Sequence, residues 1–186
     1  MKKNLMILLL ASVLISFSSC VTKQTYPEKW DKPISKDSNI EELIIGSFNC
    51  KSNNKNDGYN SYLHYSFDIN ISNNDCDTVN FKKIEANKLT VSILKNHKII
   101  SSKELVLNQD YMNQNGLLSL KSKDEFANDI FVGYGTSQKV LMLDTKGNII
   151  VKSAGYAIGT ALIVIPFYIS DEHYYIFERL KANKTE

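Results

Sequence analysis

The sequence has few of the residues that usually carry chemistry. Its 186 residues include three histidines, three cysteines and a single arginine. No His-x-x-x-His or Cys-x-x-Cys spacing prepares a pair of metal ligands. The segment "GYGTS" at 133–137 does not fit the Gly-x-Ser-x-Gly pattern of a nucleophile elbow. These absences predict a protein that is not an enzyme and that has no metal centre and no cofactor.

An excess of charge is also missing. The whole chain carries a formal net charge of +2. Removal of residues 1–19 would take away Lys2 and Lys3 and leave 20 basic against 20 acidic residues. Binding to nucleic acid depends on neutralising phosphates with an excess of lysine and arginine. We therefore expect no nucleic-acid partner.

The apolar run at the N-terminus is too short for a comfortable membrane helix. Residues 5–17 carry no charge, whereas a spanning helix needs about 18–20 apolar residues. Lys2 and Lys3 precede the run, and small residues follow it before Cys20. This order is typical of a cleavable export signal, which we assign to residues 1–19.

Phe17-Ser18-Ser19-Cys20 resembles the lipobox of bacterial lipoproteins. The resemblance implies that the Cys20 thiol receives diacylglycerol, that the signal is cut before it, and that the new amino group is acylated, as with palmitate. Each buried methylene contributes about 0.8 kcal/mol, so two or more chains anchor a protein stably. Val21 stands where an aspartate would retain a lipoprotein at the inner membrane, which implies the outer membrane, with the body facing the periplasm.

Three further segments, "EKWDKP", "LIIGSF" and "HYYIFERL", resemble landmarks of small proteobacterial outer-membrane lipoproteins. This resemblance implies no particular activity.

Cys50 and Cys76 are the remaining thiols. Outside the cytoplasm an even pair of cysteines is more often oxidised than free. We expect a disulfide between them, and closure of the loop would stabilise the fold by roughly 3 kcal/mol. The alternative is two unpaired thiols on different strands.

The chain divides into four parts. After the signal, residues 20–39 are polar, contain Pro27 and Pro33, and predict a flexible tether behind the lipid. Residues 40–182 form the predicted single domain, beginning with a short helical turn at 38–41, and 183–186 are a polar tail.

Short segments rich in β-branched and large apolar residues follow one another through the domain, separated by polar turns. They predict an all-β fold, an antiparallel meander forming a small barrel or a two-layer sandwich. Residues 139–154 predict a β-hairpin around Asp144-Thr145-Lys146-Gly147-Asn148. Alternating apolar residues predict a half-buried strand at 63–71, and the uncharged run at 154–169 predicts a buried strand rather than a membrane helix. The expected strands cover 43–48, 79–84, 88–94, 98–107 and 116–121.

Several polar groupings resemble functional sites only in part. Asp75-Cys76-Asp77 is similar to the start of the NlpC/P60 cell-wall peptidases, but two carboxylates beside Cys76 oppose thiolate formation, and His97 lies in a polar turn. Asp68, Asn70 and Ser72 alternate like calcium ligands but lack the turn glycine and the closing glutamate. Solvent exposure explains the single histidines His64, His97 and His173 and the acid pairs Glu41-Glu42, Asp124-Glu125 and Asp171-Glu172.

Three classes of function remain. The first is a structural or protein-binding lipoprotein of the cell envelope, which we favour because large strand residues would fill the core. The second is a lipocalin-like barrel whose many tyrosines line a pocket for a small apolar ligand. The third and most remote is the NlpC/P60-like peptidase. The partners expected are the membrane, through the lipid, and another envelope protein.

Overall fold

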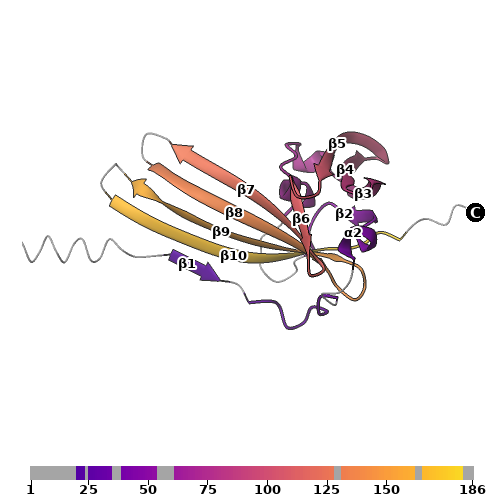
Figure 1. Cartoon of the computed structure of the whole chain (residues 1–186), viewed down its shortest axis with the longest axis horizontal. Coiled ribbons are helices and arrows are strands. Elements are labelled where there is room, and N and C mark those ends of the chain that lie inside the picture. Colours follow the sequence, from indigo (N-terminus) through magenta and orange to yellow (C-terminus); the bar gives the residue numbers. More distant parts are fainter. Residues whose placement is uncertain are drawn as a thin grey trace, which may run out of the picture. The chain divides into compact units, whose positions relative to one another are not determined.

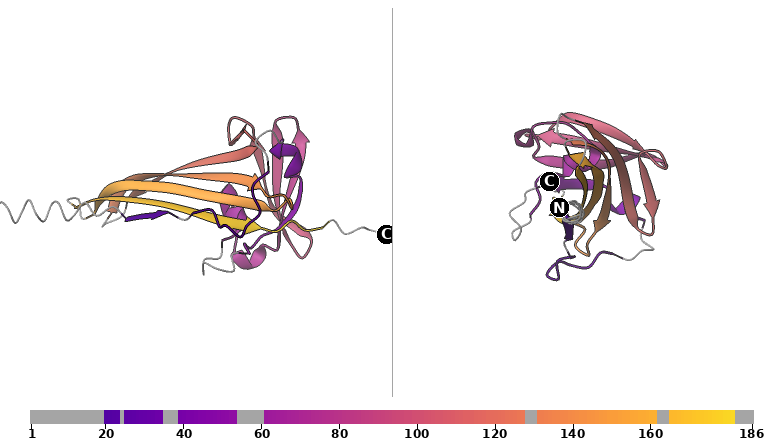
Figure 2. Two further views of the ribbon diagram at one scale, coloured as in Figure 1. Left: turned by 90° about the horizontal axis from the view of Figure 1, so that it is seen from below. Right: turned by 90° about the vertical axis from the view of Figure 1, so that its left-hand side faces the viewer.

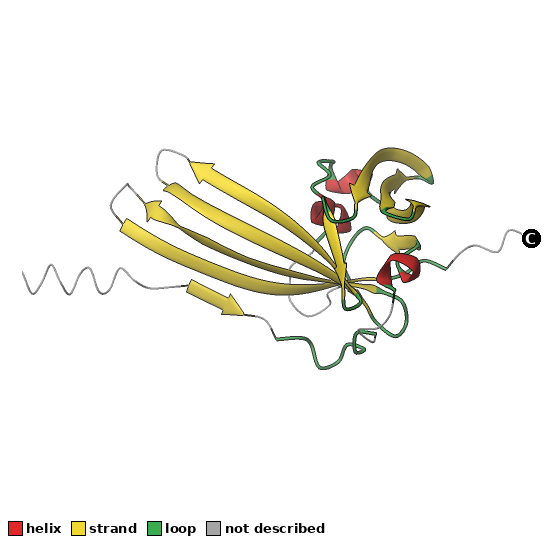
Figure 3. Cartoon of the chain, in the orientation of Figure 1, coloured by secondary structure: helices red, strands yellow, loops and turns green. Residues whose placement is uncertain are grey.

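The described part of the chain consists mostly of strands (Figure 3). The computed structural model describes residues 20–23, 25–34, 39–53, 61–127, 131–161 and 165–181. Their strands form one six-stranded and one four-stranded sheet. The all-β prediction is confirmed. Among the described residues neither sheet closes into a barrel, so the two-layer sandwich is the alternative that agrees with the structure.

All the strands of the four-stranded sheet were predicted from the sequence. Its order is β2 (Gly46–Asn49), β3 (Thr78–Glu85), β4 (Lys88–Lys95) and β5 (Lys98–Val106), all antiparallel. Alternate residues of β3 and β4 are buried, among them Val79, Phe81, Leu89 and Val91. This period of two explains why the two strands were recognisable. The first strand begins at Gly46, three residues after the predicted start.

The six-stranded sheet is dominated by four long strands that are neighbours both in the sheet and along the chain (Figure 1). Its order is β1 (Cys20–Lys23), β10 (Ile165–Phe177), β9 (Ile149–Ala161), β8 (Phe131–Leu143), β7 (Leu117–Ala127) and β6 (Tyr111–Gln114). The predicted hairpin around residues 144–148 is present as the turn between β8 and β9. Both strands extend well beyond the apolar run that predicted them, and β6 was not predicted. Figure 2 shows the twist of these strands.

Contacts divide the chain into two compact units, although the sequence predicted one domain over 40–182. Unit 1 comprises Met1–Thr25, Ser122–Gln138 and Ser153–His173. Unit 2 comprises Tyr26–Lys121, Lys139–Lys152 and Tyr174–Glu186. Each of the strands β7 to β10 contributes residues to both units.

The core of unit 2 is filled by large side chains from both sheets. Phe81 lies edge-on to Phe48 and Phe67, with ring centroids 5.7 Å and 5.4 Å apart. Tyr111 and Phe177, from the six-stranded sheet, are buried in the same cluster. Edge-to-face packing of this kind adds to the stabilisation that burial itself provides. In the same C-terminal strand Tyr174 is also buried, whereas Ile176 is partly exposed.

The strand predicted at 63–71 is wrong. Residues 63–67 instead form a 3-10 helix, η1 (Leu63–Phe67), which ends at Asp68 with a left-handed φ of 53°. As a result His64 is buried and Tyr65 is exposed, the reverse of the predicted faces. An apolar alternation of a few residues does not exclude a helical turn.

The other helical segments are short. The expected turn before β2 is α2 (Ile40–Leu43), with Asn39 as its N-cap, and η2 (Asn73–Asp75) occupies a predicted turn. Within the described ranges no helix has the length and apolar character to cross a membrane.

The described residues of the predicted tether are held against the strands. Residues 20–23 form β1, which pairs with β10. The Ile34 amide donates to the Leu143 carbonyl at 2.8 Å, and Tyr26 lies edge-on to Tyr174 at 5.5 Å. A free tether would not make such contacts with the strands. The predicted signal at 1–19 and the tail at 183–186 lie outside the described residues.

Candidate functional site

Cys20, the predicted lipidation site, is the first residue of an edge strand of the six-stranded sheet. β1 pairs with β10 in parallel, with Cys20 opposite Ile169 and Lys23 opposite Glu172. The pairing fixes the backbone of Cys20 beside β10 in unit 1.

A cluster of buried side chains surrounds Cys50 and Cys76. Their sulfur atoms are bonded, and the two Cα atoms lie 5.8 Å apart. Cys50 directly follows β2, and Cys76 ends η2 just before β3, so the antiparallel pairing of these strands brings the two together. The Cys50 amide donates to the carbonyl of Asp77, and the Cys50 carbonyl accepts from the amide of Leu63. Cys50 and Cys76 are 1% and 7% exposed, respectively.

His64 completes this cluster from η1. Its Nδ1 lies 3.4 Å from Sγ of Cys50, and the side chain is fully buried. The rings of Tyr65 and Tyr62 pack against the imidazole at centroid distances of 4.4 Å and 5.8 Å. Burial lowers the pKa of His64, while the backbone of Ile71 has a weaker effect that raises it. Within the described residues no group meets hydrogen-bond geometry at Nε2, so burial favours the neutral ring.

The cluster contains three atoms of metal-binding type within 4.8 Å of one another, from Cys50, His64 and Cys76. Zinc is bound by thiolates and by neutral imidazole, but not by sulfurs that are joined to each other. In its disulfide form the cluster therefore holds the loop 50–76 closed and does not offer a ligand set. The burial of His64 was not predicted, because a 3-10 turn and not a strand carries this side chain inward.

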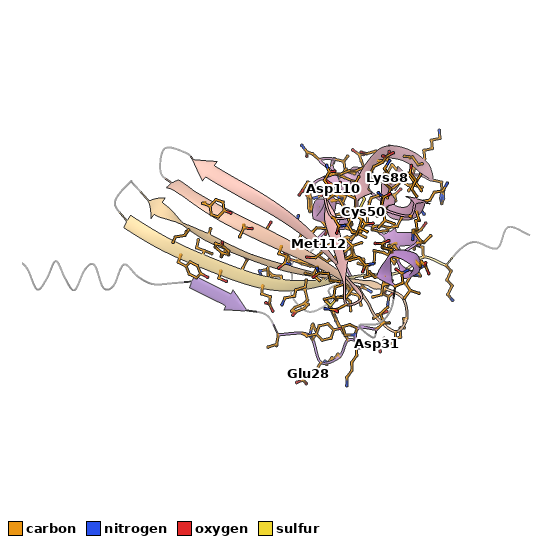
Figure 4. All side chains as sticks on the ribbon, viewed as in Figure 1. Glu28, Asp31, Cys50, Lys88, Asp110 and Met112 are labelled. Carbon is orange, nitrogen blue, oxygen red and sulfur yellow. A yellow bond between two sulfur atoms is a disulfide. The ribbon has the colours of Figure 1, made fainter. Side chains whose placement is uncertain are left out.

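A shallow depression of about 370 Å³ opens beside the disulfide. Most of its wall is polar. Asn53 donates to Oε1 of Glu178 at 2.5 Å across it. The lining residues are Asn49, Cys50, Lys51, Ser52, Asn53, Cys76, Asp77 and Glu178. Cys50 is labelled in Figure 4. This composition is unlike the apolar, tyrosine-lined cavity that a lipocalin-like protein requires.

The residues considered for peptidase chemistry are not brought together. Cys76 is bonded to Cys50, and the histidine beside that bond is His64, not His97. His97 lies in the β4–β5 turn with a φ of 62°. A disulfide sulfur has no thiolate with which to attack an amide.

The tyrosines proposed for a ligand pocket are spread over the described part of the chain. Tyr65, Tyr134, Tyr156 and Tyr168 are exposed, whereas Tyr174 is buried in unit 2. Tyr62 and Tyr175 are partly buried against the core, and Tyr59 lies outside the described residues.

The prediction that Glu41 is exposed to solvent is wrong. Glu41 is 5% exposed, and its carboxylate pairs with Nζ of Lys83 at 3.7 Å and accepts from Asn113 at 3.2 Å. Burial and the neighbouring Glu41 carboxylate raise the pKa of Tyr111 to about 12. Asp171 is exposed, as expected, and lies 3.7 Å from His173. The side chains of Asp124 and Glu125 lie outside the described residues.

The single arginine holds the turns of unit 2 together. Arg179 donates from Nε to the Gly147 carbonyl at 2.9 Å, from Nη1 to the Ile45 carbonyl at 2.9 Å, and from Nη2 to the Leu43 carbonyl. Burial lowers the pKa of its guanidinium. Its position depends on glycine, because a Cβ on Gly147 would lie 3.0 Å from Nε. Sequence analysis noted this arginine as unique but assigned it no role.

Comparison with protein-family models, with curated proteins and with solved structures found no match.

Proposed function

We propose that this chain is a lipid-anchored protein of the bacterial cell envelope, attached through Cys20, and that its folded body binds another envelope protein. The observation that carries the proposal is the location of Cys20 at the start of β1, fixed beside β10. The lipid would then be joined to the sheet itself, and the folded body would stay close to the bilayer. The outer membrane is the proposed location, with the body in the periplasm.

Binding of a protein is favoured over binding of a small apolar ligand. The core of unit 2 is packed with large side chains such as Phe48, Phe67 and Phe81, and close-packed interiors leave no space for a ligand. The depression beside the disulfide is shallow and offers amides and charges of both signs, from Lys51, Asp77 and Glu178. Such a surface suits polar contacts with another protein.

The anchor is tested by membrane fractionation of the full-length protein. We expect the wild-type chain to fractionate with membranes and its mature N-terminus to carry the mass of a diacylglycerol and an acyl chain. Cys20→Ser should leave the chain uncleaved or release it in soluble form. An unmodified mature N-terminus at a residue other than Cys20 would disprove the proposal.

The partner surface is tested in the same cells with a photoreactive amino acid at Lys51, beside the depression. We expect a discrete crosslinked adduct that is lost when Lys51 carries the probe together with Asp77→Lys. A probe at Lys88, which is labelled in Figure 4 on β4, is the matched control. Equal adducts at both positions would contradict a role for the depression.

A further inference from the structure

Large apolar side chains are exposed on three neighbouring strands of unit 1. They are Tyr134 of β8, Tyr156 and Ile158 of β9, and Tyr168 and Ile169 of β10, each 38–55% exposed. Isolated exposed hydrophobic residues need no explanation, but a contiguous group on a sheet indicates a surface that meets another apolar phase.

The position of Gly155 shows how these residues are aligned. A Cβ on Gly155 would lie 3.1 Å from Oδ1 of Asp171 and 3.9 Å from Cα of Ser137, so the three residues lie side by side on β9, β10 and β8. Because neighbouring antiparallel strands run in opposite directions, three residues toward the C-terminus on β9 match three residues toward the N-terminus on β8 and β10. An odd number of residues leads to an aligned set on the opposite face. That set is Tyr134, Ile158 and Tyr168, which we call the aromatic row. Tyr156 shares its face, because it lies two residues from Ile158.

The aromatic row lies close to the proposed anchor. Cys20 is opposite Ile169 in the register of β1 and β10, one residue from Tyr168. The sequence has no charged residue from Ser153 to Ser170, which covers most of the unit 1 part of β9 and β10. Charge returns in β7, which contains Lys121, Lys123, Asp124 and Glu125. Charge is also present at the end of the β1–β10 pairing, where Lys23 lies opposite Glu172.

We infer that the aromatic row and its neighbour Tyr156 form a second contact with the phospholipid bilayer, beside the lipid on Cys20. Tyrosine favours the boundary between headgroups and acyl chains, where its ring is buried and its hydroxyl remains hydrated. Isoleucine adds apolar area to such a contact. The contact would orient unit 1 on the membrane instead of leaving it free to rotate about the anchor. This inference rests on the proposed anchoring and adds the part of the sheet that touches the lipid.

The inference is tested with a tryptophan reporter in the full, lipidated chain. Trp30→Phe removes the only native tryptophan, and Ile158→Trp places a new one in the aromatic row. The purified protein is reconstituted into vesicles of phosphatidylethanolamine and phosphatidylglycerol, with and without brominated acyl chains. We expect a blue-shifted emission that loses most of its intensity in the brominated vesicles. Ile99→Trp, on β5 of unit 2, is the control, since Ile99 is 65% exposed.

Each other outcome overturns the inference in a recognisable way. If the protein floats with the vesicles but the reporter of Ile158→Trp is no more quenched than that of Ile99→Trp, the anchor stands and the second contact does not exist. A blue-shifted emission from Ile158→Trp that bromine does not quench would mean that a protein surface, such as a second copy, covers the row. A chain that does not float with the vesicles would refute the anchor and the second contact together.

Discussion

The guanidinium of Arg179 lies over the ring of Phe48, with 4.7 Å between its central carbon and the ring centroid. The same guanidinium donates to three backbone carbonyls, so its planar fork of N–H donors and the flat face of the group both make contacts. Lysine has neither this planar set of donors nor a flat face. The C-terminal end of the chain is thus joined to the start of β2 and to the β8–β9 turn.

Arg179→Lys should therefore destabilise the protein almost as much as Arg179→Ala. Loss of the carbonyl hydrogen bonds and of the contact with Phe48 is expected to cost about 2–4 kcal/mol. Urea unfolding followed by circular dichroism measures this change. Lys181→Ala, at an exposed neighbour, should be neutral, and an Arg179→Lys variant of wild-type stability would contradict the role of the fork.

Phe81→Ala should cost about 3–5 kcal/mol, because it removes a buried ring that packs on Phe48 and Phe67. The matched control is Ile84→Ala on the same strand, where the side chain is 51% exposed. Its expected effect is within about 0.5 kcal/mol. Similar losses at both positions would show that the core is not centred on Phe81.

Thiol labelling tests the bond between Cys50 and Cys76. In the native protein, an alkylating reagent should add no mass to these residues until the chain is unfolded and reduced. The free energy of unfolding of the Cys50→Ser, Cys76→Ser double variant should be lower by about 3 kcal/mol for a loop of this length. The variant should therefore unfold at a lower urea concentration. Alkylation of unfolded, unreduced protein would instead reveal two free thiols.

His64 should make stability depend on pH. Burial lowers its pKa in the folded protein below the ordinary value of 6.5, which the unfolded chain retains. Below that value the unfolded state binds the extra proton, so stability is fully present above about pH 6.5 and is lost as the pH falls. Urea midpoints at about pH 7.5 and pH 5 measure the loss.

His64→Gln should flatten this pH dependence, whereas His97→Gln, at an exposed turn, should leave it unchanged. An unchanged slope in His64→Gln would show that other groups cause the loss at low pH.

The sequence predicted the strands whose burial alternates, and it failed where tertiary contacts decide the structure. β3 and β4 were found within one or two residues because one face of each is buried. The unit 1 parts of β8 and β9 were missed or placed in the core, because "GYGTS" and "AGYAIG" have small, uncharged residues and an exposed apolar face. Local pattern cannot tell an apolar residue in a core from one on a surface.

Only part of the candidate site was predictable from the sequence. Cysteine counting identified Cys50 and Cys76 as a pair, since that argument depends on compartment and number. His64 was assigned to solvent because the alternation around it indicated a strand. The contacts of Arg179 join residues more than a hundred positions apart, and no local pattern encodes such a distance.

The pairing of β1 with β10 also sets an order of events. Cys20 and Ile169 are far apart in the sequence, and a ribosome makes β10 long after β1. Residues 20–23 therefore have no strand to join until β10 has been made. Long-range parallel pairing is slow to form even when both strands exist. In the anchoring proposed above, the lipid would therefore be attached to Cys20 before this pairing forms, and the edge of the sheet would close beside the anchor only after β10 has been made.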